Sequence, residues 1–228
     1  MNENRSFPVG GMVFDLDGTI VDNMSIHVEA FAVFASRHGL PPLTIEDRAR
    51  LDGKRNRDIF PVLFGRELTP GDLAAYSEEK ESLYRERSRG RLRPLRGLAT
   101  LLSVLAARSI PVVVATSAPV LNVEHTLAEL GLDSAFPQVV RGDEVPRGKP
   151  FPDVFLAAAA MISADPGACV AFEDAPIGIE AAMRAGMRTA AVTTSFGADS
   201  FLATEAPPTW IVTDFEDFLH GPGAWLTA

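Results

Sequence analysis

The sequence predicts an α/β protein, a doubly wound Rossmann-like parallel sheet with an all-helical domain inserted after its first strand. From residue 94 onwards, short and continuous apolar runs alternate with helical segments. Strands of this kind, separated by helices, are typical of a parallel sheet that is covered on both faces. Residues 23–93 contain no convincing strand. We therefore expect residues 1–22 and 94–228 to form the core and residues 23–93 to form a helical domain.

The predicted elements follow from the spacing of apolar residues and from the residues that stop each segment. An apolar run at residues 12–14 predicts the first strand, and helical spacing predicts helices over 23–39, 45–64 and 70–88. Pro94 to Gly97 then break the helical pattern. Later helices are expected over 98–108, 120–130, 153–162 and 177–185, and later strands over 112–115, about 139–140, 168–172, 189–192 and 210–212.

Composition limits the classes of function. The chain has 228 residues and a net charge of −9, which argues against nucleic acid or an anionic membrane as the main partner. Its single cysteine, Cys169, lies in an apolar run and allows no disulfide within the chain. Met1 to Gly11 lack an apolar signal segment, and the longest apolar stretch, Val154 to Ile162, is too short to span a bilayer. A cytoplasmic monomer is expected.

Acidic residues directly follow the first predicted strand. Asp15 and Asp17 are two residues apart, so on an extended strand end their side chains leave the same face. Two carboxylates that close repel each other unless a cation lies between them or one is protonated. Gly18 then allows the backbone to turn. Alone, this stretch could be an ordinary acidic turn.

The ends of the other strands supply matching chemistry. In an open parallel sheet, ligands bind at the carboxyl ends of the strands, near the point where the strand order reverses. Thr116 and Ser117 follow the second strand, Lys149 follows the third, and Glu173 and Asp174 follow the fourth. The sequence thus predicts four carboxylates, hydroxyl groups and a lysine at one edge of the sheet.

At these residues the chain resembles the haloacid dehalogenase superfamily of phosphotransferases, over nearly its whole length. Four motifs carry the resemblance in order: Asp15-Leu16-Asp17-Gly18-Thr19, Thr116 after an apolar strand, Lys149 in Gly-Lys-Pro-Phe-Pro-Asp, and Glu173-Asp174. The run from Phe172 to Ala182 is similar to the branch that contains β-phosphoglucomutase and small sugar-phosphate phosphatases. Each motif alone is weak, but four in the same order are specific.

The resemblance implies a role for each residue of the core motifs. Asp15 is the expected nucleophile, which forms an aspartyl-phosphate, and Asp17 is the expected general acid and base. Thr116, Ser117 and Lys149 are expected to bind the phosphoryl group, with Thr116 and Lys149 also counted as catalytic. The expected metal ligands are Asp15, Asp17 through its backbone carbonyl, Glu173 and Asp174. An all-oxygen site beside phosphate favours Mg²⁺ as the cofactor.

The inserted helices match the helical cap of this family, which closes over the site and sets specificity. Gly53, Lys54, Arg55 and Arg57 form a cationic run that could bind a second anionic or polyhydroxyl part of the substrate. The same run could equally be the solvated start of a helix. His27 lies where the β-phosphoglucomutase branch carries a histidine near the acid/base, although a helical histidine is more often structural.

The leading hypothesis is a Mg²⁺-dependent phosphatase that hydrolyses a small phosphorylated metabolite, a sugar or polyol phosphate. Asp17 supports cleavage of a phosphate ester, because an alkoxide leaving group needs a proton. An intramolecular phosphomutase of the β-phosphoglucomutase type is the nearest alternative, weakened by Asp52, which stands where the mutases place a lysine. A phospho-accepting signalling module is a remote third reading, disfavoured by the cap and by Asp17.

Overall fold

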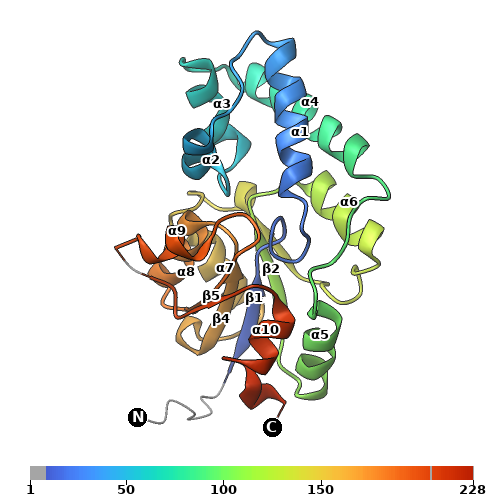
Figure 1. Ribbon diagram of the computed structural model, residues 1–228, viewed down its shortest axis with the longest axis vertical. Helices are drawn as coiled ribbons and strands as arrows, with labels where there is room; N and C mark the ends of the chain where they lie inside the picture. The colour runs from blue at the N-terminus through green and yellow to red at the C-terminus, as the bar shows by residue number, and fades with distance from the viewer. Residues whose placement is uncertain (1–8, 206, 228) are drawn as a thin grey trace.

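The computed structural model describes residues 9–205 and 207–227, and they form a six-stranded parallel sheet with helices on both faces (Figure 1). The strand order is β3-β2-β1-β4-β5-β6. The strands are β1 Gly11–Phe14, β2 Val112–Thr116, β3 Val139–Arg141, β4 Cys169–Glu173, β5 Arg188–Val192 and β6 Trp210–Val212. The chain moves outward from β1 to β3 and then returns to the other side of β1, so the order reverses between β1 and β4. The predicted fold class is confirmed.

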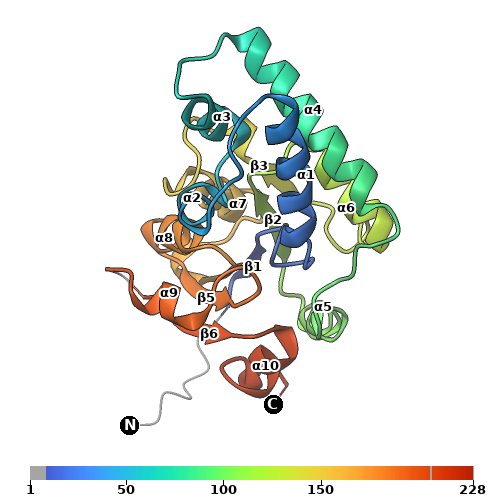
Figure 2. The same ribbon diagram turned by 45° about the horizontal axis from the view of Figure 1, so that its top comes forward.

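The two faces of the sheet are covered by different helices (Figure 2). Met12 and Phe14 of β1 are buried on one face, and the ring of Phe14 stacks 5.0 Å from that of Phe172. Helices α5 Leu98–Ala107, α6 Val120–Leu130 and α10 Phe215–His220 cover that face. Val13 points the opposite way, under α7 Asp153–Met161 and α8 Pro176–Arg184. Because successive side chains of a strand point to opposite faces, β1 contributes to the apolar core on each side of the sheet.

The inserted segment forms the cap, a group of helices that lies beyond the carboxyl ends of the strands (Figure 1). These helices are α1 Met24–Arg37, α2 Ile45–Leu51, α3 Asn56–Phe64 and α4 Pro70–Ser88, and they share a separate apolar core around Phe34 and Phe60. The two connections to the sheet domain lie side by side, because the amide of Leu95 donates to the carbonyl of Ile20 at 2.9 Å. The domain limits at 22/23 and 93/94 stay a prediction.

Two details differ from the predicted elements. The helix expected over 45–64 is interrupted after Leu51, where Gly53 takes a φ of +86° and its backbone lies against Ile177 of α8. The close approach to the core therefore separates α2 from α3. Two short helices, α9 Ala198–Leu202 and α10, are additional, and α10 is held by its buried Phe215 and Phe218.

The chain's first residues lie outside the described part of the structure. The expectation that Met1 to Gly11 hold no secretory signal falls largely on these residues. Within the described ranges, no helix is long and apolar enough to cross a bilayer.

Candidate active site

A buried lysine joins two carboxylates at the reversal point of the sheet. Asp15 follows β1, Glu173 ends β4, and the Lys149 Nζ lies 2.7 Å from a carboxylate oxygen of each. All three side chains are buried, at 5%, 0% and 3% exposure for Asp15, Glu173 and Lys149. Burial raises the pKa of Asp15 to about 7, although the charge of Lys149 opposes the rise. The same two carboxylates outweigh burial at Lys149 and raise its pKa, so this lysine is charged.

Asp174 adds a third carboxylate to this cluster. Oxygens of Asp15, Glu173 and Asp174 lie within 4.8 Å of one another. Burial, and then the charges of Glu173 and Asp15, raise the pKa of Asp174 well above its usual value. Three carboxylates face one lysine, so a divalent cation at this point would balance the remaining negative charge.

The Asp174 carboxylate is held close to the first motif. Gly18 has a φ of +77°, and a Cβ at this position would overlap the Asp174 carboxylate. Ser195 donates a hydrogen bond to the Asp174 Oδ2, which orients the carboxylate. Because the donor atoms that this cluster offers are carboxylate oxygens, it would suit a hard cation such as Mg²⁺ or Ca²⁺.

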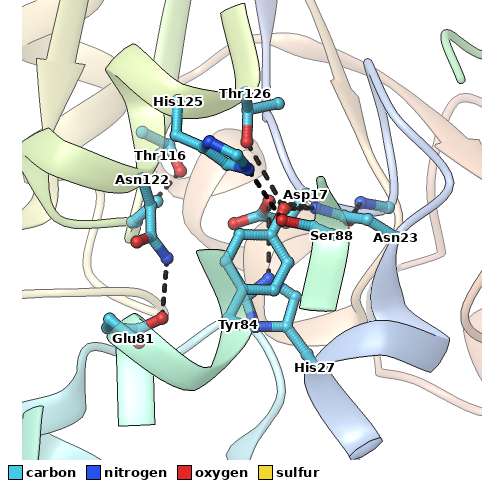
Figure 3. Close-up of polar contacts among 12 residues, drawn as sticks. Asp17, Asn23, His27, Glu81, Tyr84, Ser88, Thr116, Asn122, His125 and Thr126 are labelled. Carbon is cyan, nitrogen blue, oxygen red and sulfur yellow. Dashed lines mark hydrogen bonds and ion pairs between the residues drawn. The ribbon is translucent and has the colours of Figure 1, made fainter. Parts of the chain in front are cut away.

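Asp17 faces the cap instead of this cluster (Figure 3). Asn23, just before α1, donates to the Asp17 Oδ1 at 2.6 Å, and the His27 Nε2 lies 3.6 Å from the same oxygen. Burial alone would raise the pKa of Asp17, but His27, Asn23 and Lys80 together hold it below its usual value. The carboxylate of Asp17 is outside the three-carboxylate cluster, which leaves only its backbone carbonyl for the metal role that the sequence suggests.

A pocket between the sheet edge and the cap collects most of the predicted site residues. Its lining includes Asp15, Asp17, Thr116, Ser117, Lys149 and Asp174 from the core, and His27, Gly53 and Lys54 from the cap. Thr116 ends β2, is 1% exposed and accepts a hydrogen bond from the amide of Ala118 at 3.0 Å. The hydroxyl of Ser117 donates to the carbonyl of Gly53 at 2.6 Å, so this core loop also contacts the cap.

Comparison with known proteins agrees with this geometry. The sequence model of the family described as "Haloacid dehalogenase-like hydrolase" matches residues 12–192. The chain belongs to this family. The matched segment begins in β1 and ends with β5, so it contains both the three-carboxylate cluster and the cap.

Several proteins similar to this hydrolase have names that state an activity. It is 34% identical over 185 residues to hexitol phosphatase A of Escherichia coli, covering 80% of this chain and 82% of that one. It is 35% identical over 179 residues to the fructose-1-phosphate phosphatase YqaB of the same organism, covering 78% and 93%. With the β-phosphoglucomutase of Bacillus subtilis it shares 33% identity over 188 residues, covering 77% and 80%. A solved hydrolase structure from Pseudomonas syringae superimposes with a TM-score of 0.84 at 26% identity, covering 94% and 98%.

In this hydrolase the cap reaches the pocket through a buried polar network that the sequence did not suggest. The Lys80 Nζ of α4 lies 2.9 Å from the His27 Nδ1 and 3.0 Å from the Glu81 Oε1. Glu81 also accepts from Asn56 of the cap at 2.8 Å and from Asn122 of the core helix α6 at 2.6 Å. Figure 3 shows Glu81 and Asn122 meeting across the boundary between the cap and the core.

Tyr84 extends the network toward Asp17. Its ring stacks on that of His27, with centroids 3.9 Å apart, and its hydroxyl accepts from Asn23 at 2.5 Å and contacts Thr126 of α6. Asn23 therefore holds Asp17 on one side and Tyr84 on the other. The sequence does not predict these contacts. Lys80, Glu81 and Tyr84 belong to a helix whose many charged residues are typical of a solvated surface.

Gly53 and the three cations that follow it, Lys54, Arg55 and Arg57, have different positions. Gly53 and Lys54 line the pocket, whereas Arg57 is exposed. Arg55 is buried at 9% exposure and donates to Asp58 and to two carbonyls of the core. Among the described residues that line the pocket, neither Arg55 nor Arg57 appears. The structure therefore brings Gly53 and Lys54, but not Arg55 and Arg57, to the pocket.

Proposed function

We propose that this hydrolase is a Mg²⁺-dependent phosphatase that acts on a small phosphorylated sugar or polyol through a phosphoaspartate on Asp15. The observation that carries the proposal is the position of Lys149 between Asp15 and Glu173, with Asp17 on the cap side of the same pocket. The names of two relatives, a hexitol phosphatase and a fructose-1-phosphate phosphatase, support the substrate class.

The geometry supports a two-step transfer. An Asp15 oxygen attacks phosphorus and the ester oxygen leaves with a proton from Asp17. In the second step Asp17 takes a proton from water, the water oxygen attacks the phosphoaspartate, and Asp15 is released together with phosphate. In this proposal Lys149 holds Asp15 and supplies positive charge beside the transferred group, and the hydroxyl of Thr116, which lines the same pocket, would donate to a phosphoryl oxygen.

Asp17 must be protonated for the first step although the cap lowers its pKa. A substrate phosphate placed beside Asp17 raises that pKa by like-charge repulsion, so the substrate itself favours the acid form. Mg²⁺ held by Asp15, Glu173, Asp174 and the backbone carbonyl of Asp17 would neutralise charge on the phosphoryl oxygens. Residues of the cap line the pocket together with those of the core, which would limit the access of bulk water to the reacting groups.

An intramolecular phosphomutase is the second candidate. The 33% identity to the B. subtilis β-phosphoglucomutase and the position of His27, 3.6 Å from Asp17, favour it. Asp52 counts against it, because this pocket-lining residue is a carboxylate paired with Arg48 at 2.8 Å and therefore supplies no cation for a bisphosphorylated intermediate. We therefore place hydrolysis first.

A phosphate-release screen over sugar, polyol and short-acid phosphates, run with Mg²⁺, tests the proposal. We expect free phosphate from at least one sugar or polyol phosphate and none from an Asp15→Asn variant. β-Glucose 1-phosphate with a trace of bisphosphate primer separates the candidates, because glucose 6-phosphate as the product would favour the mutase. A phosphoaspartate stable for minutes without turnover of any ester would instead favour a signalling module. A monomeric state and a cytoplasmic location stay predictions.

A further inference from the structure

Arg55 connects the cap to the core at the start of α3. Its Nε donates to the Asp58 Oδ2 at 2.6 Å and its Nη2 to the Asp58 Oδ1 at 3.2 Å, both within the cap. Its Nη1 crosses to the core and donates to the carbonyls of Gly142 and Val145 at 3.1 and 3.3 Å. Asp58 therefore holds the guanidinium in the orientation in which it binds the turn after β3.

The stem of Arg55 also lies against the loop that carries Lys149. A Cβ at Gly148 would come within 2.7 Å of the Arg55 Nε and 3.1 Å of its Cδ. A Cβ at Gly142 would lie 3.1 Å from the same Cδ. Gly148 does not have a positive φ, so a methyl group there would disturb Arg55 and not the backbone. Arg55 thus packs directly beside the residue that precedes the lysine.

From these contacts we infer that Arg55 is a positioning residue, which holds the cap closed and fixes the loop that carries Lys149, and that it does not bind substrate. The inference rests on the proposed function, in which Lys149 must lie within hydrogen-bonding distance of Asp15. The cap contact of Ser117 with Gly53, two residues before Arg55, lies on the same boundary. Small displacements of a catalytic group cost up to about a hundredfold in rate.

A positioning role and a substrate-binding role predict different dependence on substrate. If Arg55 acts through the Lys149 loop, its loss lowers turnover of every phosphate ester, including p-nitrophenyl phosphate, which has no polyol part. If Arg55 binds the polyol, its loss affects the sugar phosphate and leaves p-nitrophenyl phosphate unchanged. For Arg55→Ala we expect kcat to fall by about 10- to 100-fold with both substrates. Arg55→Lys should recover only part, since an ammonium cannot reproduce the planar fork of donors.

A double-mutant cycle with Gly148→Ala tests the contact itself. The added methyl group displaces Arg55 in the wild-type background, so Gly148→Ala should lower kcat about as much as Arg55→Ala. In the Arg55→Ala background the space is free, and the second substitution should change kcat by less than about twofold. Arg50→Ala is the matched control, because Arg50 is an exposed cap arginine that pairs with Asp47 within α2.

Amide hydrogen exchange over residues 142–149 gives a readout that needs no turnover. Exchange there should be faster in Arg55→Ala and in Gly148→Ala than in wild type, and unchanged in Arg50→Ala. Loss confined to the sugar phosphate, additive effects in the cycle, or unchanged exchange would each overturn the inference. If Arg55→Ala does not fold, Gly148→Ala alone decides by the same exchange readout. If the wild-type protein hydrolyses no ester but the variants still show the expected differences in exchange, the proposed function is refuted and the contact of Arg55 with the Lys149 loop stands.

Discussion

Glu81 is the residue whose replacement should destabilise the boundary between cap and core most clearly. It is 4% exposed, and its carboxylate accepts hydrogen bonds from Lys80 at 3.0 Å, Asn56 at 2.8 Å and Asn122 at 2.6 Å. Glu81→Gln keeps the shape of the side chain but removes its charge. It also turns one acceptor into a donor that faces the donors around it.

The expected loss of stability arises because the buried charge of Lys80 loses its carboxylate partner. Removing one member of a buried ion pair costs about 3–5 kcal/mol in the free energy of unfolding. Burial alone would raise the pKa of Glu81, but Lys80, His27 and the hydrogen bond from Asn56 lower it below its ordinary value of 4.5. A carboxylate with a lowered pKa contributes stability above the unfolded pKa, and this contribution is lost as the pH falls through the folded pKa. The difference between wild type and Glu81→Gln should therefore be complete at pH 7 and should shrink below about pH 4.5.

Urea unfolding followed by circular dichroism measures this difference. With an m-value of about 3 kcal/mol/M, the midpoint at pH 7 should fall by about 1 to 1.7 M. Glu86→Gln is the matched control, since Glu86 lies on the same helix but is exposed, and its midpoint should stay within the error of measurement. A loss below about 1 kcal/mol at pH 7, or an equal loss at pH 7 and pH 4, would refute the role given to Glu81.

Three further changes test the core of the site. Asp17→Asn should lower kcat by about a hundredfold or more without changing the circular dichroism spectrum, because an amide cannot supply the proton; a rate near wild type would count against the acid/base role. Excess chelator should abolish phosphate release and added Mg²⁺ should restore it, whereas full activity in chelator would exclude the metal site. Gly18→Ala should abolish the rise in Tm that Mg²⁺ gives the wild type, because its methyl group overlaps the Asp174 carboxylate; an unchanged rise would contradict the placement of the cation.

The core of the site could be predicted because sheet topology brings strand ends together. Asp15, Lys149 and Glu173 are up to 158 residues apart in sequence, yet each follows an apolar strand of the same parallel sheet. The sequence therefore places all three at one edge without any knowledge of the loops. The division between Asp15 and Asp17 could not be predicted from their spacing. That spacing places both side chains on one face only if the strand continues, whereas β1 ends at Phe14 and Asn23 holds the Asp17 carboxylate toward the cap.

The cap contacts could not be predicted in the same way. Along α4, Lys80 and Glu81 are neighbours in a run of charged residues, and that run alone does not distinguish a buried pair from a solvated one. Their burial depends on how α4 packs against α6, where Asn122 supplies the partner. The position of Arg55 could not be predicted for the same reason. Three cations in four residues suggest an anion site, but the pattern is the same when one of them faces backbone carbonyls of the core, as Arg55 does.

The pKa values of Asp15 and Asp17 depend on groups in different parts of the molecule. Besides burial, the pKa of Asp15 depends mainly on Lys149 and Glu173 of the core. The pKa of Asp17 depends, besides burial, on His27, Asn23 and Lys80, which lie at the start of the cap or within it. A movement of the cap should therefore change the pKa of Asp17 more than that of Asp15. His27 and Lys80, which lower the pKa of Asp17, also line the pocket and lie 2.9 Å apart, so the proposed substrate-binding wall and the groups that act on Asp17 are the same part of the cap. Substitutions of His27 or Lys80 should for that reason alter kcat as well as KM, although neither residue belongs to the first motif.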